Sequence, residues 1–232
     1  MPESRIIPAI IPQSLEHLGE AIATLRGVAH EIQIDIVDGL FVPFTSWPYA
    51  DETADQKDIA SRISLLENIV PSGIACEFDL MIARPLETLP AWLALRPARI
   101  VLHIESVADD AETMQTIKVV HDAGSKAILA SGNDMALERL LALAASVDGV
   151  QCMGIAEIGR QGNPFDTRVL DRIAAIREAY PLLSISVDGS VNTETIPLLK
   201  EAGANRFVAG SSIFNSADPA SAYTQLLTLL TP

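Results

Sequence analysis

Acidic side chains and one histidine stand near the ends of short apolar segments in this sequence. Asp35 lies in "EIQIDIV", Asp79 in "EFDLMI", His103 in "VLHIES" and Asp188 in "SISVD". Carboxylates that converge lose hydration and repel one another, so they must bind a cation, share protons or accept hydrogen bonds. Each of these arrangements is typical of a functional site that performs acid and base chemistry or holds a metal.

The positions of these residues in their segments suggest different roles. Asp35 and Asp188 lie too far inside apolar segments to serve as helix caps alone, and we predict a functional role for both. Asp79 fits a ligand and a structural acceptor equally well, and His103 fits a catalytic residue and a core histidine equally well. Asp38, which precedes a glycine, is predicted to brace a turn or cap a helix. The remaining histidines fall in helical segments and are expected at the surface: His17, His30 and His121.

Strand and helix patterns alternate along all 232 residues. Strands are predicted at 5–11, 31–37, 75–82, 99–105, 126–130, 149–155, 182–188 and 206–210. Helical patterns such as "TRVLDRIAAIREAY" follow most of them. Repeated β-then-α units require parallel strands with right-handed crossovers, so we predict an α/β fold, a (β/α)8 barrel, as a single domain over residues 1–232. An open doubly wound sheet is the alternative, and units of similar length without a break in composition favour the barrel.

Strand alternation predicts which polar side chains share a face. Gln33 and Asp35 lie opposite a row of isoleucines, and in a barrel this polar pair would face the interior. The same alternation predicts three further sets: Asp79 with Glu77 and Met81, His103 with Glu105, and Asp188 with Ser184 and Ser186. Because the C-terminal ends of barrel strands carry the chemistry, these residues are the expected site.

Three segments rich in glycine and serine predict an anion site. "EIGRQGNPF" follows the sixth strand, "VDGSVNTET" the seventh and "AGSSIFNS" the eighth. Backbone N–H groups in such loops form the phosphate cradle of many (β/α)8 barrels. The predicted phosphate contacts are Gly159, Arg160, Gly162, Gly189, Ser190, Gly210 and Ser211.

Composition excludes some classes of partner. The formal net charge of −14 argues against nucleic acid and anionic membrane surfaces, which select clustered lysine and arginine. Cys76 and Cys152 lie in apolar runs and are expected to be reduced and buried. No apolar stretch is long enough to span a bilayer and the first residues lack a signal-peptide pattern, so we expect a soluble cytoplasmic protein.

Segments spread over nearly the whole chain resemble the ribulose-phosphate 3-epimerase family. They include "IIPAIIPQSLEHLGEAI", "QIDIVDGLFVP", "FDLMI", "VLHIES" and "SVDGSVNTETIPLLKEAGANRFVAGSSIF". The resemblance implies that Asp35 and Asp188 are the acid/base pair, which moves a proton α to a carbonyl through an enediolate. It also implies a phosphorylated sugar as substrate, with Met81 and His103 near it, and a homo-oligomer in which Trp92 or Tyr49 could belong to an interface.

The sequence departs from the family pattern at the site. The family's metal site takes two histidines with the two aspartates, and here those positions are Gln33 and Asp79. The resulting set of Gln33, Asp35, Asp79 and Asp188 offers oxygen donors, which suit Mg²⁺ or Mn²⁺ better than Zn²⁺, or it holds no metal. The family's first-strand serine is Ala9, its asparagine after "FVP" is Phe44, and the loop after the sixth strand loses a glycine.

Three functions follow from this pattern. The first is epimerisation of a phosphorylated ketose, as in pentose phosphate metabolism, by Asp35 and Asp188. The second is an aldolase or decarboxylase that works through an enediolate on the same barrel, for which His103 would be the additional group. The third is a phosphosugar-binding protein without turnover.

Overall fold

The computed structural model describes residues 2–50, 59–156, 158 and 163–231. Its strands, β1 to β8, form a closed parallel barrel in chain order, with helices between them. This confirms the predicted α/β fold class, the (β/α)8 or TIM barrel, over the open sheet. By their internal contacts the residues form two compact units, a C-terminal unit of Met1–Ala9 with Ile128–Pro232 and an N-terminal unit of Ile10–Ala127. That residues 1–232 form one domain stays a prediction.

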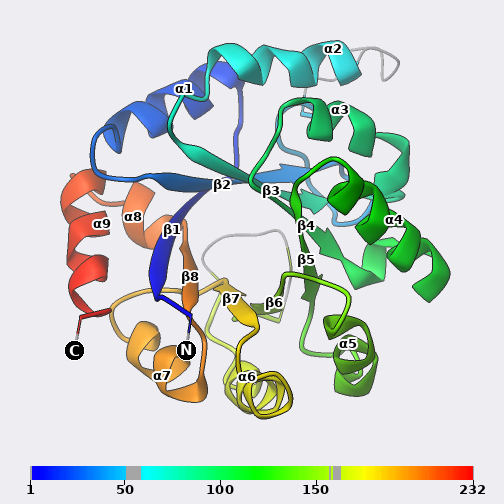
Figure 1. Ribbon diagram of the computed structural model, residues 1–232. Coiled ribbons are helices and arrows are strands. Elements are labelled where there is room, and N and C mark those ends of the chain that lie inside the picture. The colour runs from blue at the N-terminus through cyan, green and yellow to red at the C-terminus, as the bar shows by residue number, and fades with distance from the viewer. Residues whose placement is uncertain (1, 51–58, 157, 159–162, 232) are drawn as a thin grey trace. The chain divides into compact units, whose positions relative to one another are not determined.

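The N-terminal unit holds three consecutive paired strands, shown side by side in Figure 1. They are β2 (Glu31–Val37), β3 (Ala75–Met81) and β4 (Arg99–His103). Its helices are α1 (Leu15–Thr24), α2 (Ile59–Ser64), α3 (Leu89–Ala94) and α4 (Asp110–Asp122), with 3₁₀ turns η2 (Leu65–Asn68), η3 (Pro85–Glu87) and η4 (Ile104–Ser106). Side chains that accept backbone N–H groups begin two of these helices: Ser14 caps α1 and Asp109 caps α4.

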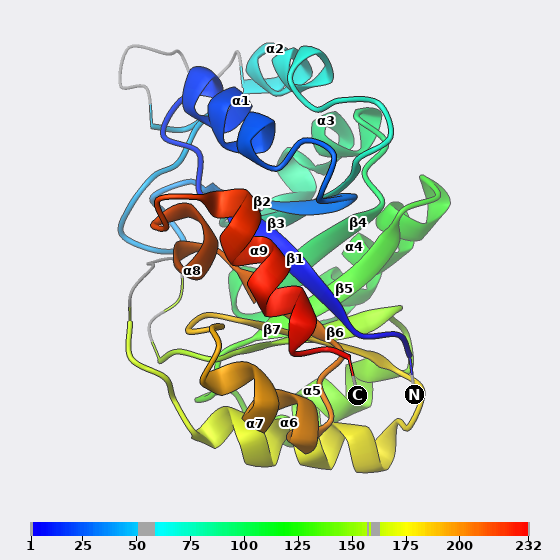
Figure 2. The same ribbon diagram turned by 90° about the vertical axis from the view of Figure 1, so that its left-hand side faces the viewer.

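The C-terminal unit holds the remaining elements. β1 (Arg5–Ile10) pairs with β8 (Arg206–Ala209), and β5 (Lys126–Ser131), β6 (Gly149–Met153), β7 (Ser184–Asp188) and β8 pair in succession. Its helices are α5 (Leu137–Ala144), α6 (Arg168–Ala179), α7 (Thr195–Ala202), α8 (Ser211–Phe214) and α9 (Pro219–Thr228). Figure 2 shows α6 and α7 lying next to each other. Ile7, Ala9 and Val208 form a buried cluster on β1 and β8.

Several details of the sequence-based prediction are wrong. β4 ends at His103 and the chain turns into η4, so Glu105 is exposed and does not share a strand face with His103. Trp92 is fully buried, because α3 turns it toward β3, where its ring packs 5.1 Å from that of Phe78. It therefore does not offer a surface for an interface, and Tyr49 is only half-exposed.

Both cysteines are free, with Cys152 buried and Cys76 half-buried. Among the described helices, none combines the length and the apolar character needed to cross a membrane.

Candidate active site

The register between β2 and β3 aligns the polar residues of these strands. Asp35 is the partner of Asp79, Gln33 of Glu77, and Val37 of Met81. Partners in a parallel pair project from the same face of the sheet, so these side chains form one set. Gln33, Asp35 and Asp79 are all at most 4% exposed. Two carboxylates are therefore held on neighbouring strands and away from bulk water.

Each of these two carboxylates accepts a hydrogen bond from a buried side chain. Gln33 Nε2 donates to Asp35 Oδ1 over 2.8 Å within β2, since residues two apart on a strand share a face. His103 Nε2 lies 2.8 Å from Asp79 Oδ1, and both side chains are fully buried. With Asp79 ionised, the imidazole nitrogen is the donor.

An ion cluster lies near the beginning of the same strands. Arg99 Nε lies 3.4 Å from Glu31 Oε1 and 3.6 Å from Glu77 Oε2, and the Glu77 side chain is fully buried. A buried carboxylate requires such a partner, because its desolvation is otherwise costly. From the sequence, Glu77 was noted only because it shares a strand face with Asp79. Arg99, the first residue of the next strand, could have indicated the ion pair.

Asp38 organises the loop after β2. Its Oδ1 accepts from the N–H groups of Leu40 and Phe41, at 2.8 Å and 3.0 Å, and its Oδ2 accepts from Ala83 N at 2.7 Å. Three backbone donors are thus satisfied by one carboxylate. The prediction that Asp38 braces a turn is confirmed.

Asp188 ends β7 in the C-terminal unit, where the next residues pack closely on the end of β6. Gly154 N donates to Asp188 O over 2.6 Å. A Cβ at Gly154 would lie 2.1 Å from Gly189 O, so only glycine fits at this approach. Gly189 itself has φ +96°. The main chain at Asp188 is therefore held by the end of β6.

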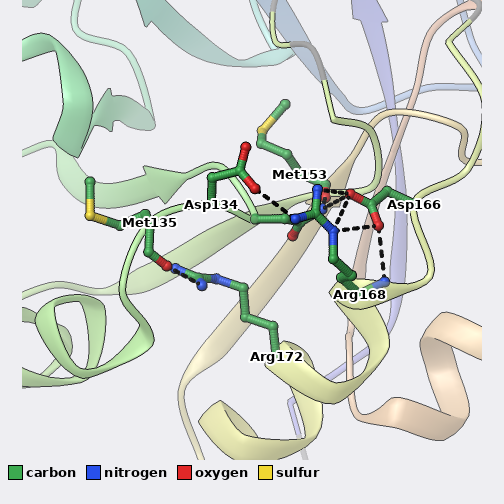
Figure 3. A network of polar contacts seen from close by, with 7 residues as sticks. Asp134, Met135, Met153, Asp166, Arg168 and Arg172 are labelled. Carbon is green, nitrogen blue, oxygen red and sulfur yellow. Dashed lines mark hydrogen bonds and ion pairs between the residues drawn. The ribbon is translucent and has the colours of Figure 1, made fainter.

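A polar network joins the ends of β5 and β6 to the start of α6 (Figure 3). Asn133 Nδ2 donates to Met153 O at 2.9 Å and to Asp166 Oδ2 at 3.0 Å, and Asp166 N donates to Gly154 O at 2.8 Å. Arg168 holds Asp166 through Nε and NH2 and also pairs with Asp134 at 2.6 Å. The hydrogen bonds from Arg168 lower the pKa of Asp166 from 3.8 to about 2.

This network fixes both ends of the segment between Gly154 and Asp166. Sequence reasoning missed it, although "SGND" directly after the fifth strand is a polar strand end that could have indicated it. Arg172, also drawn in Figure 3, is buried beside it and donates to Met135 O and to Ser131 Oγ.

The segments that follow β6, β7 and β8 touch one another within the C-terminal unit. Ser190 Oγ donates to Asn163 O, and Ser212 Oγ donates to Val191 O over 2.8 Å. Gly210 and Ser211 stand at the start of α8. The predicted phosphate residues Gly189, Ser190, Gly210 and Ser211 are thus on connected loops, whereas Gly159, Arg160 and Gly162 lie outside the described residues.

Two acidic side chains of the N-terminal unit, Asp35 and Asp79, could take part in holding a metal ion, and Asp188 of the C-terminal unit is a further carboxylate at a strand end. Carboxylate oxygens, with the amide oxygen of Gln33 as a further oxygen donor, are the ligands that Mg²⁺ and Mn²⁺ prefer. The donor set therefore fits a hard divalent cation. Gln33, the first predicted metal ligand, donates from Nε2 to Asp35 Oδ1.

The closed parallel barrel with carboxylates at strand ends defines the class, a (β/α)8 barrel with an acidic site. The chain belongs to the ribulose-phosphate 3-epimerase family, whose model matches residues 5–214. It is 31% identical to a ribulose-phosphate 3-epimerase of Eremothecium gossypii over 82% of this chain and 77% of the relative. It is 28% identical to the ribulose-phosphate 3-epimerase of Bacillus subtilis over 96% of this chain and 97% of the relative. The predicted isomerase of the epimerase type is confirmed at the level of the family.

Solved structures of other barrels are similar in fold. A 3-hexulose-6-phosphate synthase from Salmonella typhimurium superposes with a TM-score of 0.67 at 16% identity, covering 97% of this chain and 98% of that one. KGPDC from Streptococcus mutans in complex with D-R5P gives 0.72 at 12% identity, covering 97% and 96%. At these identities the similarity shows the fold alone.

Proposed function

We propose that the protein epimerises a phosphorylated ketose by moving a proton α to the carbonyl, with Asp35 and Asp188 as the acid/base pair. The observation that carries the proposal is the buried carboxylate of Asp35, oriented by Gln33 at 2.8 Å, in a chain of the epimerase family. A buried carboxylate with one fixed donor is arranged to accept a proton in a defined direction.

Inversion at carbon requires a proton acceptor and a proton donor on opposite faces of the substrate. One aspartate takes the proton from the carbon next to the carbonyl, and the other returns a proton to the opposite face of the enediolate. The loops after β6, β7 and β8, with Gly189, Ser190, Gly210 and Ser211, are the proposed phosphate contacts. Ser190 keeps its hydroxyl engaged with Asn163, so its contribution would come from the main chain.

We propose Mg²⁺ or Mn²⁺ as the cation, with Asp35, Asp79, Asp188 and the Gln33 amide oxygen as ligands. When bound, it would offset the negative charge that develops on the substrate oxygens. Met81, the register partner of Val37 and 3% exposed, belongs to the same strand face as Asp79 and is the proposed apolar contact of the sugar.

A cytoplasmic location and a homo-oligomer are part of the same proposal, and a 28% identical relative from Oryza sativa is named a cytoplasmic isoform.

The test is deuterium incorporation from solvent into ribulose 5-phosphate and other ketose phosphates, followed by NMR. We expect exchange by the wild type and a loss of roughly 10²- to 10⁴-fold in Asp35→Asn and in Asp188→Asn. Asp122→Asn, which changes an exposed carboxylate paired with Lys118, is the matched control and should exchange like the wild type.

The alternatives give other results in the same experiment. Cleavage of a carbon–carbon bond would indicate the lyase, and phosphate esters that raise the melting temperature without exchange would indicate a binding protein. His103, the additional group that the lyase would need, is fully buried against Asp79, which favours the epimerase. Exchange that persists in both aspartate variants would refute the acid/base assignment.

A further inference from the structure

His103 is placed on β4 so that it reaches the neighbouring strand. Asp79 on β3 is the register partner of Val101, and His103 lies two residues further along β4 on the same face. Its Nε2 is 2.8 Å from Asp79 Oδ1, and both side chains are 0% exposed. The Nε2 atom of the imidazole is engaged with Asp79, so His103 acts on the site through that carboxylate.

The imidazole ring is itself fixed by the loop after β2. The Phe41 ring packs on it with centroids 5.3 Å apart and an interplanar angle of 49°. Phe41 in turn is anchored by its backbone N–H on Asp38 Oδ1 at 3.0 Å. The loop therefore excludes water from the pair and limits the rotation of His103.

The His103–Asp79 pair resembles the Gln33–Asp35 pair on the neighbouring strand. Asp35 and Asp79 are register partners, and each has one oxygen engaged by a side-chain donor, Gln33 in the first case and His103 in the second. A hydrogen-bond donor on a ligating carboxylate fixes which way its remaining lone pairs point. Neighbouring carboxylates that are both held in this way are ordered before a cation arrives.

We propose that His103 is a positioning residue that orients the Asp79 carboxylate for a divalent cation. The inference rests on the proposed function in that Asp79 is a proposed cation ligand there. Loss of such a partner typically weakens metal binding or activity by roughly 10- to 100-fold. His103 takes no part as a ligand.

The experiment measures Mn²⁺ binding to the whole protein by electron paramagnetic resonance of the free ion, without substrate. His103→Leu removes the donor and keeps an apolar side chain, whereas His103→Gln retains a terminal N–H₂ at a similar reach. We expect the dissociation constant to rise roughly 10- to 100-fold in His103→Leu and to stay close to the wild-type value in His103→Gln. His30→Leu, at an exposed histidine, is the matched control and should bind like the wild type.

Three results would overturn the inference: no Mn²⁺ binding by the wild type, equal affinity in His103→Leu, or an equal loss in His103→Leu and His103→Gln. If His103→Leu does not fold, His103→Asn replaces it, because its shorter side chain keeps a donor that cannot reach Asp79. The proposed function fails separately. If Mn²⁺ binding depends on His103 but the wild type shows no solvent exchange, the epimerase proposal is refuted and the positioning role stands. If the wild type shows exchange but does not bind Mn²⁺, the positioning role is refuted and the epimerase proposal stands.

Discussion

The approach of Gly154 to Gly189 makes a sharp prediction about stability. An alanine Cβ at position 154 would lie 2.1 Å from Gly189 O and 3.4 Å from Val187 Cγ1. The first contact is with a main-chain atom, so no side-chain rotation relieves it. The end of β6 must move away from the end of β7, and this movement stretches the 2.6 Å hydrogen bond from Gly154 N to Asp188 O.

The expected cost of Gly154→Ala follows from these two effects. Overpacking at a rigid position costs about 1–3 kcal/mol. Weakening a main-chain hydrogen bond costs about 1 kcal/mol. Replacing glycine stabilises the protein by roughly 0.4–1 kcal/mol, because alanine lowers the conformational entropy of the unfolded chain. We therefore expect a net loss of about 2 kcal/mol, which in a protein of this size lowers the melting temperature by roughly 4–8 °C.

Urea denaturation and thermal scans at pH 7 test this prediction, with Gly19→Ala as the control. Gly19 lies in α1, and its Cβ would meet only Ile69 Cγ2 at 3.8 Å. Gly19→Ala should gain roughly 0.5–1 kcal/mol, because alanine restricts the unfolded chain and favours the helix. If Gly154→Ala were as stable as the wild type, the ends of β6 and β7 could not be as close as the structure places them.

Three further predictions concern single residues. Asp38→Ala should lower the free energy of unfolding, measured by urea titration, by about 2 kcal/mol, because three backbone N–H donors lose their acceptor. An unchanged free energy would show that Asp38 does not stabilise the loop. Arg168 holds the pKa of Asp166 at about 2, so this pair stabilises the fold above about pH 4 and ceases to do so as the pH falls toward 2. Arg168→Ala should therefore lower the free energy of unfolding at pH 7 and lower it progressively less as the pH falls, whereas an equal loss at every pH would argue against the pair. Burial raises the pKa of Cys152 to about 12, so native Cys76→Ser protein should not react with Ellman's reagent at pH 8 but should react in guanidinium chloride. Rapid reaction of the native variant would show that Cys152 is accessible.

Sequence periodicity was sufficient to predict the barrel, because each strand and helix pattern is local and eight repeats leave few topologies. Alternation also predicted that Gln33 and Asp35 share a face, since this depends on their spacing alone. Where an element ends was less predictable. β4 stops at His103 rather than at Glu105, because the chain turns into η4 there, and this turn leaves Glu105 exposed.

Tertiary structure decided the partners. Which donor serves Asp79 depends on the register of β3 with β4, and sequence alone left His103 equally suited to two roles. The Asp166 network joins residues 33 positions apart in the chain, from Asn133 to Asp166, and no local pattern encodes such a contact. The sequence by itself determined the fold class and the chemical types at the strand ends, because these follow from local periodicity. The hydrogen bond between His103 and Asp79 came only from packing, because these residues lie on separate strands and meet only when β3 and β4 are aligned.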